Sequence, residues 1–441
     1  MLGLRSALFA VGVTLAAAQV ITGTALADPA PSGSGQDGSQ PAWPTRPGEN
    51  QFPRLPSETD IYPFIPVPLP TDDPWYADPA DLDNLANGDV IRKRVVTTYL
   101  LAVPWPPVHT EQILYRSTDS RDHPIATATT VLIPGIPWLG PGTRPVISYQ
   151  EAIDSLDPAC NPSHTLRAGT MKETQLLLQF LGEGMAVSVP DFNGKTNTTL
   201  APSEGRMVLD GVRAVRRAGI GMDNSAVGLW GYSGGGSATA WAAELHRSYA
   251  PELPIKGSAQ GGVPGNKHAM TAHAMDAGAG IAGQADFIGW IWLIGLSREF
   301  PDLLPLDKFL TTDGMTVAHD IEHRCLYTAA ATGAWRPLKN YLKDQNAFLD
   351  PDIQNVLHRD SLGYADTPDI PVTMWHSTTD PLIPIAAIEP VVKAYCAAGV
   401  NLRFFRVPAS EHISAELIGY EPSLLWLTAV LAGADPGPTT C

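Results

Sequence analysis

The most constraining feature of this chain is the pentapeptide Gly-Tyr-Ser-Gly-Gly at residues 231–235. It has the G-x-S-x-G pattern, which places a serine on a tight turn between a strand and a helix. The context fits, because an apolar run at residues 226–230 precedes the motif and a helix-forming stretch follows at residues 237–245. Glycines permit the sharp turn and the close packing of strand and helix. An ordinary glycine-rich turn is the alternative, but the flanking elements favour an exposed, nucleophilic Ser233.

Apolar runs of strand length recur from residue 91 onward, and segments of helix length separate many of them. We predict strands at residues 95–103, 126–133, 145–149, 186–189, 226–230, 255–259, 372–375 and 402–407. We predict helices at residues 171–182, 207–217, 237–247 and 386–398. Pro390 must fall in the first turn of the last helix, where a missing N–H is tolerated. Strands that alternate with helices predict an α/β fold, with a mostly parallel central sheet flanked by helices.

One segment, residues 266–350, departs from this alternation, because helix formers dominate it and no convincing strand occurs. We predict a helical cap insertion there, which divides the sheet domain into residues 75–265 and 351–441. Within the cap, residues 287–296 form an apolar run that is too short to span a bilayer. The run could be a buried core helix, or its apolar face could line an acyl pocket, and both can hold. For the second case the candidate substrate contacts are Phe287, Trp290, Ile291 and Ile294.

The N-terminal segment has the pattern of a secretory signal peptide. Arg5 is the only charge before Asp28, residues 7–20 are apolar, and Ala27 ends a small-x-small cleavage site. We predict cleavage after Ala27 and an extracellular protein. A retained membrane anchor is the alternative, but the apolar segment is short for a membrane span. Residues 28–74 are rich in Pro, Gly, Ser and Asp, which predicts a linker or a loosely packed arm.

Charge and cysteine content narrow the possible partners further. The 441-residue chain carries a formal net charge of −16, which argues against nucleic-acid binding because phosphate contacts dominate that affinity. An exported chain with four cysteines suggests two disulfides, for which three pairings exist. We favour Cys160–Cys325 and Cys396–Cys441, because the second pair would hold the last residue in place. No two cysteines have C-x-x-C spacing, so we expect no metal.

A serine hydroxyl is a weak nucleophile that needs a base within hydrogen-bond reach and a carboxylate to orient the base. On α/β-hydrolase sheets these residues follow in the order Ser, Asp or Glu, His. His412 comes in a loop just after the predicted strand 402–407, and Asp380 comes in a turn just after the strand 372–375. Both therefore fall at the carboxyl edge of the sheet, where active sites of open α/β sheets lie. We predict the triad Ser233, Asp380 and His412.

The base and the acid of this triad have competitors. His376 is a rival base, but it lies nearer the strand interior and precedes the acid. Asp366 and Asp369 are rival acids, but they precede the strand rather than follow it. Taken singly, His412 could be a surface histidine and Asp380 a turn residue or helix cap. Their joint order after the G-x-S-x-G motif favours the triad.

An oxyanion that develops on the substrate needs preorganised N–H donors. The backbone N–H of Gly234, the residue after the nucleophile, is the expected first donor. The second should come from a loop after an early strand, and residues 149–154 fit that place. The sequence pattern alone does not select one residue of this loop.

The chain resembles the secretory lipase family of the α/β-hydrolase superfamily. The resemblance rests on Y-Q-E-A-I-D-S-L-D-P-A-C at 149–160, G-Y-S-G-G-G at 231–236, D-P-L-I-P at 380–384 and S-E-H at 410–412. It covers the chain from about residue 75 to the C-terminus. The resemblance implies the same triad, supports the favoured disulfide pairs, and points to the backbone N–H of Asp154 as the second oxyanion donor. It also implies that the helical cap covers a lipid-chain tunnel.

From these features we expect a secreted serine ester hydrolase, in first place a triacylglycerol lipase that acts through an acyl-enzyme on Ser233. We expect its partner to be a lipid or another ester, which a lipid–water interface could present, with no nucleic acid and no integral membrane segment in the mature chain. The chemistry requires no metal and no cofactor. A carboxylesterase for short esters, an acyltransferase, and a non-catalytic binding module on the same fold are the alternatives.

Overall fold

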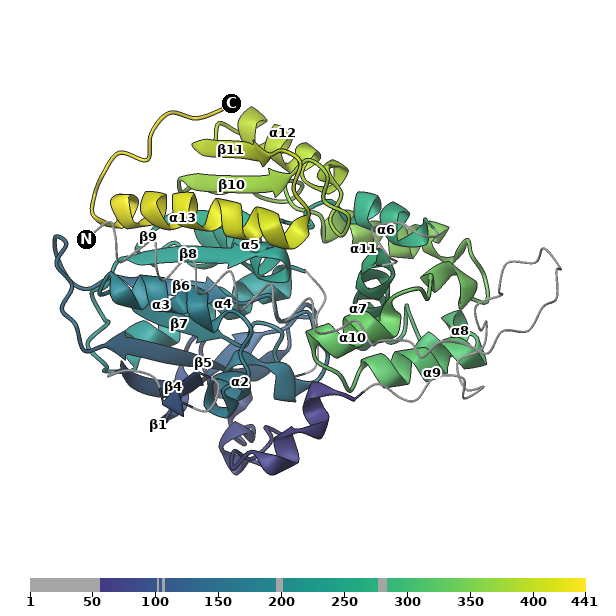
Figure 1. The fold of residues 1–441 in the computed structure, drawn as a ribbon, viewed down its shortest axis with the longest axis horizontal. Helices are drawn as coiled ribbons and strands as arrows, with labels where there is room; N and C mark the ends of the chain where they lie inside the picture. The colour runs from purple at the N-terminus through teal and green to yellow at the C-terminus, as the bar shows by residue number, and fades with distance from the viewer. Residues whose placement is uncertain (1–55, 101–102, 105–107, 196–200, 277–283) are drawn as a thin grey trace, which may run out of the picture. The chain divides into compact units, whose positions relative to one another are not determined.

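The computed structural model describes residues 56–100, 103–104, 108–195, 201–276 and 284–441. A nine-stranded sheet with the order β1-β4-β5-β7-β6-β8-β9-β10-β11 runs through the centre of this part (Figure 1). The strands from β7 to β11 in this order are parallel, whereas β1, β4 and β5 pair antiparallel at one side. The predicted α/β-hydrolase architecture, a mostly parallel sheet flanked by helices, is confirmed.

The strands of the central sheet are β1 (Val90–Val95), β4 (Val108–Thr118), β5 (Pro124–Pro134), β6 (Val146–Gln150), β7 (Ala186–Pro190), β8 (Val227–Tyr232), β9 (Ile255–Gly261), β10 (Val372–Ser377) and β11 (Leu402–Val407). The prediction of one strand at residues 95–103 is wrong. The chain forms β1 there and then a separate hairpin of β2 (Tyr99–Leu100) and β3 (Val103–Pro104). The long strand β4 was not predicted, because polar residues such as Glu111 and Gln112 interrupt its apolar pattern.

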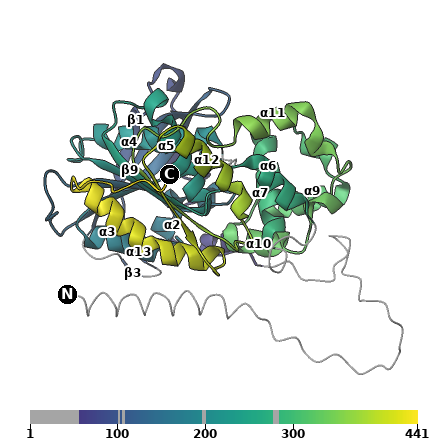
Figure 2. The same ribbon diagram turned by 90° about the horizontal axis from the view of Figure 1, so that it is seen from above.

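Helices cover both faces of the sheet (Figure 2). They are α2 (Pro162–Ala168), α3 (Thr174–Gly182), α4 (Pro202–Arg217), α5 (Ser233–Tyr249), α12 (Glu389–Ala397) and α13 (His412–Leu431). The helices α3 and α13 pack on one face, and α4, α5 and α12 pack on the other. Pro390 lies in the first turn of α12, as predicted.

The helix α13 was not predicted from the sequence. Pro422 lies inside it, and its apolar residues extend around the helix, with Ile413, Ile418 and Leu425 exposed and Leu424 and Leu427 buried. An all-round apolar helix has no amphipathic stripe, which is the signal that identifies helices in a sequence.

Among the described residues between β9 and β10, helices dominate, and the one strand-like feature is an isolated bridge between Leu310 and Leu342. The helices are α6 (Lys267–Met275), α7 (Gln284–Glu299), α8 (Leu306–Phe309), α9 (Thr312–Ile321), α10 (Leu326–Gly333) and α11 (Pro351–Arg359). They enclose a hydrophobic core of their own, with α7 contributing much of it. In Figure 1 this insertion, drawn in green, extends from one side of the sheet core.

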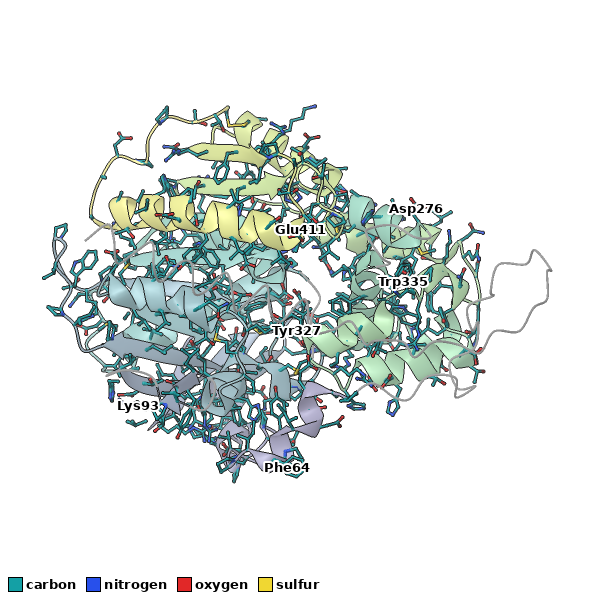
Figure 3. The ribbon with its side chains drawn as sticks, viewed as in Figure 1. Phe64, Lys93, Asp276, Tyr327, Trp335 and Glu411 are labelled. Carbon is teal, nitrogen blue, oxygen red and sulfur yellow. A yellow bond between two sulfur atoms is a disulfide. The ribbon has the colours of Figure 1, made fainter. Side chains whose placement is uncertain are left out.

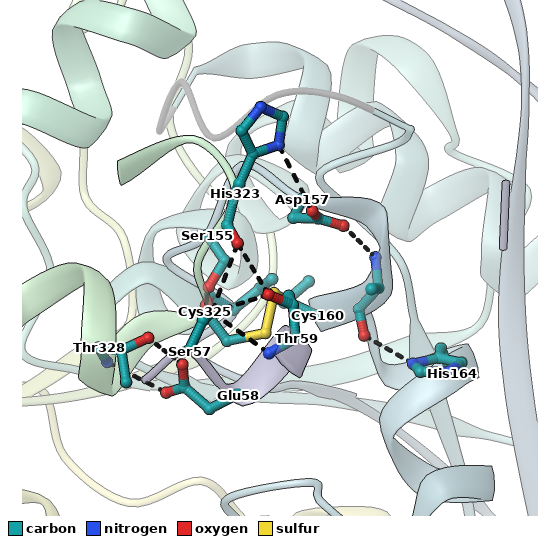
Figure 4. The surroundings of a disulfide bond; sticks show 12 residues. Ser57, Glu58, Thr59, Ser155, Asp157, Cys160, His164, His323, Cys325 and Thr328 are labelled. Atoms are coloured by element: carbon teal, nitrogen blue, oxygen red, sulfur yellow. Dashed lines mark hydrogen bonds and ion pairs between the residues drawn. A yellow bond between two sulfur atoms is a disulfide. The ribbon is translucent and has the colours of Figure 1, made fainter. Parts of the chain in front are cut away.

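The favoured disulfide pairing is confirmed. Cys160–Cys325 joins the chain just before α2 to the helical insertion, and Cys396–Cys441 joins α12 to the last residue (Figure 4 shows the first pair). The C-terminal segment also covers β11, the edge strand, because Thr440 N–H donates to Leu402 O and Phe404 N–H donates to Thr440 Oγ1. Hydrogen bonding along an edge strand protects it from pairing with other chains.

In the described part of the chain, none of the helices has both the length and the apolar content needed to cross a lipid bilayer. The predicted signal peptide and the start of the predicted arm lie outside the described residues. The described part of that arm forms the short 3-10 helices η1 (Glu58–Asp60), η2 (Tyr62–Phe64) and η3 (Pro74–Tyr76), and η4 (Leu82–Asn84) follows it. Tyr62 packs beside the Cys160–Cys325 bridge.

Candidate active site

Ser233 lies at the junction between β8 and α5, with a left-handed φ of 56°. A non-glycine residue rarely adopts this conformation, and such strain is concentrated at functional sites. The residues around it must be small, because a Cβ atom at Gly235 would overlap with the carbonyl of Gln150 in the neighbouring strand β6. Ser233 itself is only partly buried. The predicted strand, tight turn and helix are therefore present, and they hold the serine hydroxyl accessible.

The structure brings Ser233, His412 and Asp380 together. The Nε2 atom of His412 lies 2.8 Å from Ser233 Oγ, and its Nδ1 atom lies 2.6 Å from Asp380 Oδ2. Asp380 follows β10 and accepts backbone N–H bonds on its other oxygen from Leu382 and Ile383, both at 2.9 Å. The carboxylate orientation is thus fixed by its own turn.

His412 is the first residue of α13, which corrects the expectation that it lies in a loop. Its neighbour Glu411 is the N-cap and lies at the end of α13 that faces the insertion (Figure 3). The carbonyl of His412 accepts a hydrogen bond from Tyr232 Oη at 2.7 Å. Because Tyr232 directly precedes Ser233, this bond connects the backbone of His412 to the turn that carries Ser233.

Burial and charge act in opposite directions on His412. Burial would lower its pKa, but the ionised Asp380 in contact with it outweighs burial and raises the pKa of His412. Burial would raise the pKa of Asp380, and the histidine outweighs that effect and lowers it. Glu416, one turn further along α13, also favours the imidazolium, and burial raises its own pKa to about 7. The pair is therefore arranged to stabilise a proton on His412 during a reaction.

The rival residues bond other partners. His376 is fully buried, donates to Ile383 O at 2.8 Å, and lies 4.0 Å from Asp380 Oδ2. Asp369 pairs with His246 at 2.7 Å, and Asp366 accepts from the N–H of Thr367.

The two candidate oxyanion donors belong to residues in contact. Gly234 is in the first turn of α5, so its N–H has no acceptor within the helix. A Cβ atom at Gly234 would overlap with Oδ1 of Asp154, which shows how closely the two residues approach. Asp154 has a left-handed φ of 41° and is buried, and burial raises its pKa. This local strain orients the loop after β6 toward the serine turn.

A buried polar network supports that loop, and the sequence did not reveal it. Glu173 accepts from the N–H of Ala152 at 2.9 Å and from Tyr149 Oη at 2.7 Å. Lys172 forms an ion pair with Glu151 at 3.3 Å. Burial raises the pKa of Glu173, and the charges of neighbouring acids raise it further. Lys172 and Glu173 directly precede α3. The local sequence does not indicate that they support the loop after β6, because their partners belong to that other segment.

The four apolar candidates for substrate contact, Phe287, Trp290, Ile291 and Ile294, all lie on α7. They are buried inside the hydrophobic core of the insertion. Trp290 Nε1 donates to Arg336 O, and its ring meets Tyr341 edge-on. This packing accounts for their apolar character, and their contact with a substrate remains a prediction.

A serine on a strained strand–helix turn, with histidine and aspartate following later parallel strands, defines the class of α/β-hydrolases. The comparisons identify the family within it. The family model of the secretory lipases matches residues 160–438. The chain belongs to the secretory lipase family.

Similar proteins agree with this assignment. A probable inactive lipase of Mycobacterium tuberculosis is 34% identical, with 83% of each chain covered. Lipase A of Arthroderma benhamiae is 31% identical, with 86% of this chain and 83% of the relative covered. The crystal structure of Candida antarctica lipase A in its closed state has a TM-score of 0.77 and 28% identity, covering 85% of this chain and 90% of that one. The protein is thus a carboxylic-ester hydrolase of a secreted family.

Proposed function

We propose that the protein is a triacylglycerol lipase that cleaves acyl esters through an acyl-enzyme on Ser233. The observation that carries the proposal is the continuous hydrogen-bonded chain from Ser233 through His412 to Asp380. In this mechanism Ser233 Oγ attacks the ester carbonyl while His412 Nε2 accepts its proton. Asp380 orients the imidazole and stabilises the imidazolium. His412 then returns the proton to the leaving alcohol, and water releases the acid by the same steps.

The backbone N–H groups of Gly234 and Asp154 would bind the oxyanion of the tetrahedral intermediate. Donors of this kind lower the barrier because they are already oriented when charge develops. The contact between Gly234 and Asp154 and the left-handed backbone of Asp154 support this role. The buried Glu173 would act as a positioning residue, since its bond to Ala152 N–H holds the loop that carries Asp154.

We further propose cleavage of the signal peptide after Ala27 and action of the mature enzyme on lipid esters at a lipid–water interface. The secretory family supports an extracellular site of action. Exposed Ile413 and Ile418 on α13, the helix that begins with His412, give that side of the molecule an apolar character suited to lipid.

The experiment compares Ser233→Ala with a matched control, Ser237→Ala. Ser237 lies one turn later in α5, is buried, and its hydroxyl has no hydrogen-bond partner within the described part of the chain. We expect Ser233→Ala to lose about 10⁶-fold in kcat and Ser237→Ala to retain wild-type activity, with equal thermal stability. Activity is measured on esters from acetate to oleate, including emulsified triolein, in the presence and absence of an acceptor alcohol.

Preference for short soluble esters would instead indicate a carboxylesterase, and transfer to the alcohol in preference to water would indicate an acyltransferase. Full turnover by Ser233→Ala would refute the acyl-enzyme mechanism.

A non-catalytic binding protein is the second candidate, because one relative is named a probable inactive lipase. The intact Ser233–His412 contact of 2.8 Å favours catalysis. A fluorophosphonate probe separates the two, since it labels only an activated serine. Labelling of the wild type and of Ser237→Ala, but not of Ser233→Ala, supports the enzyme. Absence of labelling in a folded wild-type protein supports the binding protein.

A further inference from the structure

A group of histidine and carboxylate side chains lies on the insertion, outside the candidate active site. His319 is in the last turn of α9, Glu322 caps that helix, and His323 follows. Among the described residues, these three form the one group of at least three His, Cys, Asp or Glu side chains whose ligand atoms all lie within 4.8 Å of one another. Histidines four residues apart, as here, present their rings on one side of a helical turn, which is the spacing of helical metal sites.

The ligand atoms are close to the distances that a metal ion would require. Glu322 Oε1 lies 2.9 Å from His319 Nδ1 and 3.6 Å from His323 Nε2. Two ligands of a tetrahedral zinc ion, each at its usual bond length, are separated by about 3.4 Å. The observed separations lie on either side of this value, so small side-chain rotations would complete the geometry. The rings are accessible to an ion, with 75% of the His319 side chain and 56% of the His323 side chain exposed.

The carboxylate of Glu322 is already oriented for such a role. Its Oε2 accepts from Arg298 at 3.0 Å, which leaves Oε1 directed at the two imidazoles. Arg298 also donates to Leu156 O at 2.8 Å, so the carboxylate is fixed against the loop after β6.

The backbone that carries His323 is held on several sides (Figure 4). The carbonyl of His323 accepts from Thr59 Oγ1 at 3.0 Å, and Arg324 is fully buried and bonded to Asp320. Cys325 then forms the disulfide with Cys160. A ligand set mounted on a fixed backbone loses less conformational freedom when it binds an ion.

An outer carboxylate faces the second nitrogen of His323. Asp157 Oδ2 lies 4.0 Å from His323 Nδ1, and its Oδ1 is fixed by the N–H of Ala159 at 2.8 Å. Histidines that bind a metal usually donate their other N–H to a carboxylate, which sets the tautomer and the ring orientation. Asp157 is suited to this task after a small ring movement.

We propose that His319, Glu322 and His323 bind a divalent transition-metal ion of the zinc type, with Asp157 as the outer partner of His323. Two imidazoles and one carboxylate favour such an ion over Mg²⁺ or Ca²⁺, which prefer oxygen ligands. Water would occupy the remaining positions. The site lies far in sequence from the triad and has no role in the ester chemistry.

The ion would fasten the helical insertion to the sheet core. Glu322 and His323 belong to the insertion, whereas Asp157 and Leu156 belong to the loop after β6 that also carries Asp154. Their side chains also line one end of a cavity of about 780 Å³ that extends to Asp73 and Asp191. Binding to the folded state alone raises stability in proportion to the logarithm of ion concentration over Kd.

The test titrates ZnCl₂ into the secreted protein after dialysis against a chelator, by calorimetry and by thermal unfolding. We expect one Zn²⁺ per chain and a rise in Tm of a few degrees at saturation, with no rise in Ca²⁺ or Mg²⁺. The variants are His319→Ala, His323→Ala and Asp157→Asn. Loss of the outer carboxylate should weaken binding about 10–100-fold, and loss of either imidazole should weaken it further.

His123→Ala is the matched control, because His123 is an exposed histidine that faces one carboxylate, Asp119, at 3.4 Å. It should leave the zinc affinity unchanged. The proposal is overturned by a wild-type protein that shows neither heat nor a Tm shift, by binding that persists in His319→Ala/His323→Ala, or by equal loss in His123→Ala. A Ca²⁺ effect as large as that of Zn²⁺ would overturn the assigned ion class.

Discussion

At the scale of single residues, two buried histidines lie within 4.0 Å of the same carboxylate oxygen, and one of them bonds it. His412 Nδ1 lies 2.6 Å from Asp380 Oδ2, and His376 Nε2 lies 4.0 Å from it. His376 already donates to a backbone carbonyl, and burial lowers its pKa, so it stays neutral. His412 keeps its second nitrogen for Ser233. The chain order of motif and strand ends selected the same pair, but the sequence could not show that His376 bonds a backbone carbonyl.

If His412 is the general base, as proposed, its raised pKa should determine the acid limit of activity. A general base works only when neutral, so kcat/KM should fall as pH drops through a value above the ordinary imidazole pKa of about 6.5. Asp380→Asn removes the charge that raises the pKa. We expect this variant to lose about 10⁴-fold in kcat and to shift its acid limb to lower pH. The measurement is the pH profile of ester hydrolysis.

Asp369→Asn supplies the control for this profile, since Asp369 also bonds a histidine, His246 at 2.7 Å, but no serine lies beyond it in the described contacts. Its profile should match the wild type. An acid limb that stays in place in Asp380→Asn would disprove the coupling between the two triad residues.

At the scale of elements, the candidate site lies at the carboxyl edge of the parallel sheet, where Ser233, Asp380 and His412 follow β8, β10 and β11. The tight turn between β8 and α5 that carries Ser233 was predictable, and so was the turn after β10. Glycine, proline and apolar periodicity encode both turns locally. The helix α13 was not predictable, because it is apolar on all sides. Glu173 was not predictable either, since it meets Tyr149 through a packing of distant segments that no local pattern records.

The contact between the α5 turn and the loop after β6 leads to a prediction on Gly234. Gly234→Ala places a methyl group where Asp154 Oδ1 lies, so Asp154 must move away from the serine turn. Because Asp154 is the proposed second oxyanion donor, we expect kcat to fall by about 10²–10³-fold. KM should change less, since the donors act chiefly on the transition state. Steady-state kinetics on a soluble nitrophenyl ester measures both constants.

Gly182→Ala is a suitable comparison, because Gly182 ends α3 and nothing lies within 4 Å of an added Cβ. That variant should keep wild-type kinetics. Unchanged kcat in a folded Gly234→Ala protein would contradict the assignment of the oxyanion donors.

At the scale of the whole molecule, two disulfides act on different parts. Cys160–Cys325 joins the sheet core to the helical insertion across 165 residues, and Cys396–Cys441 closes 45 residues at the C-terminus. The pairing could be predicted from the even count of cysteines and the position of the last one. The internal core of the insertion could not be predicted, because apolar residues on α7 suit a substrate tunnel and a packed interior equally well.

The two bridges should differ in their contribution to stability. Cross-linking lowers the entropy of the unfolded chain by an amount that grows with the logarithm of loop length, which corresponds to about 5 kcal/mol for the longer loop and about 4 kcal/mol for the shorter. Cys160→Ala/Cys325→Ala should therefore lower Tm more than Cys396→Ala/Cys441→Ala, as measured by thermal unfolding under non-reducing conditions.

The Cys396–Cys441 disulfide has a local effect as well. Without it the segment that bonds Leu402 and Phe404 can detach and expose the outer edge of β11, the edge away from β10. This variant should aggregate faster at equal fraction folded, by light scattering, because a free edge strand pairs with other chains. Equal aggregation of the two double variants would show that the C-terminal segment stays bound to β11 without its disulfide.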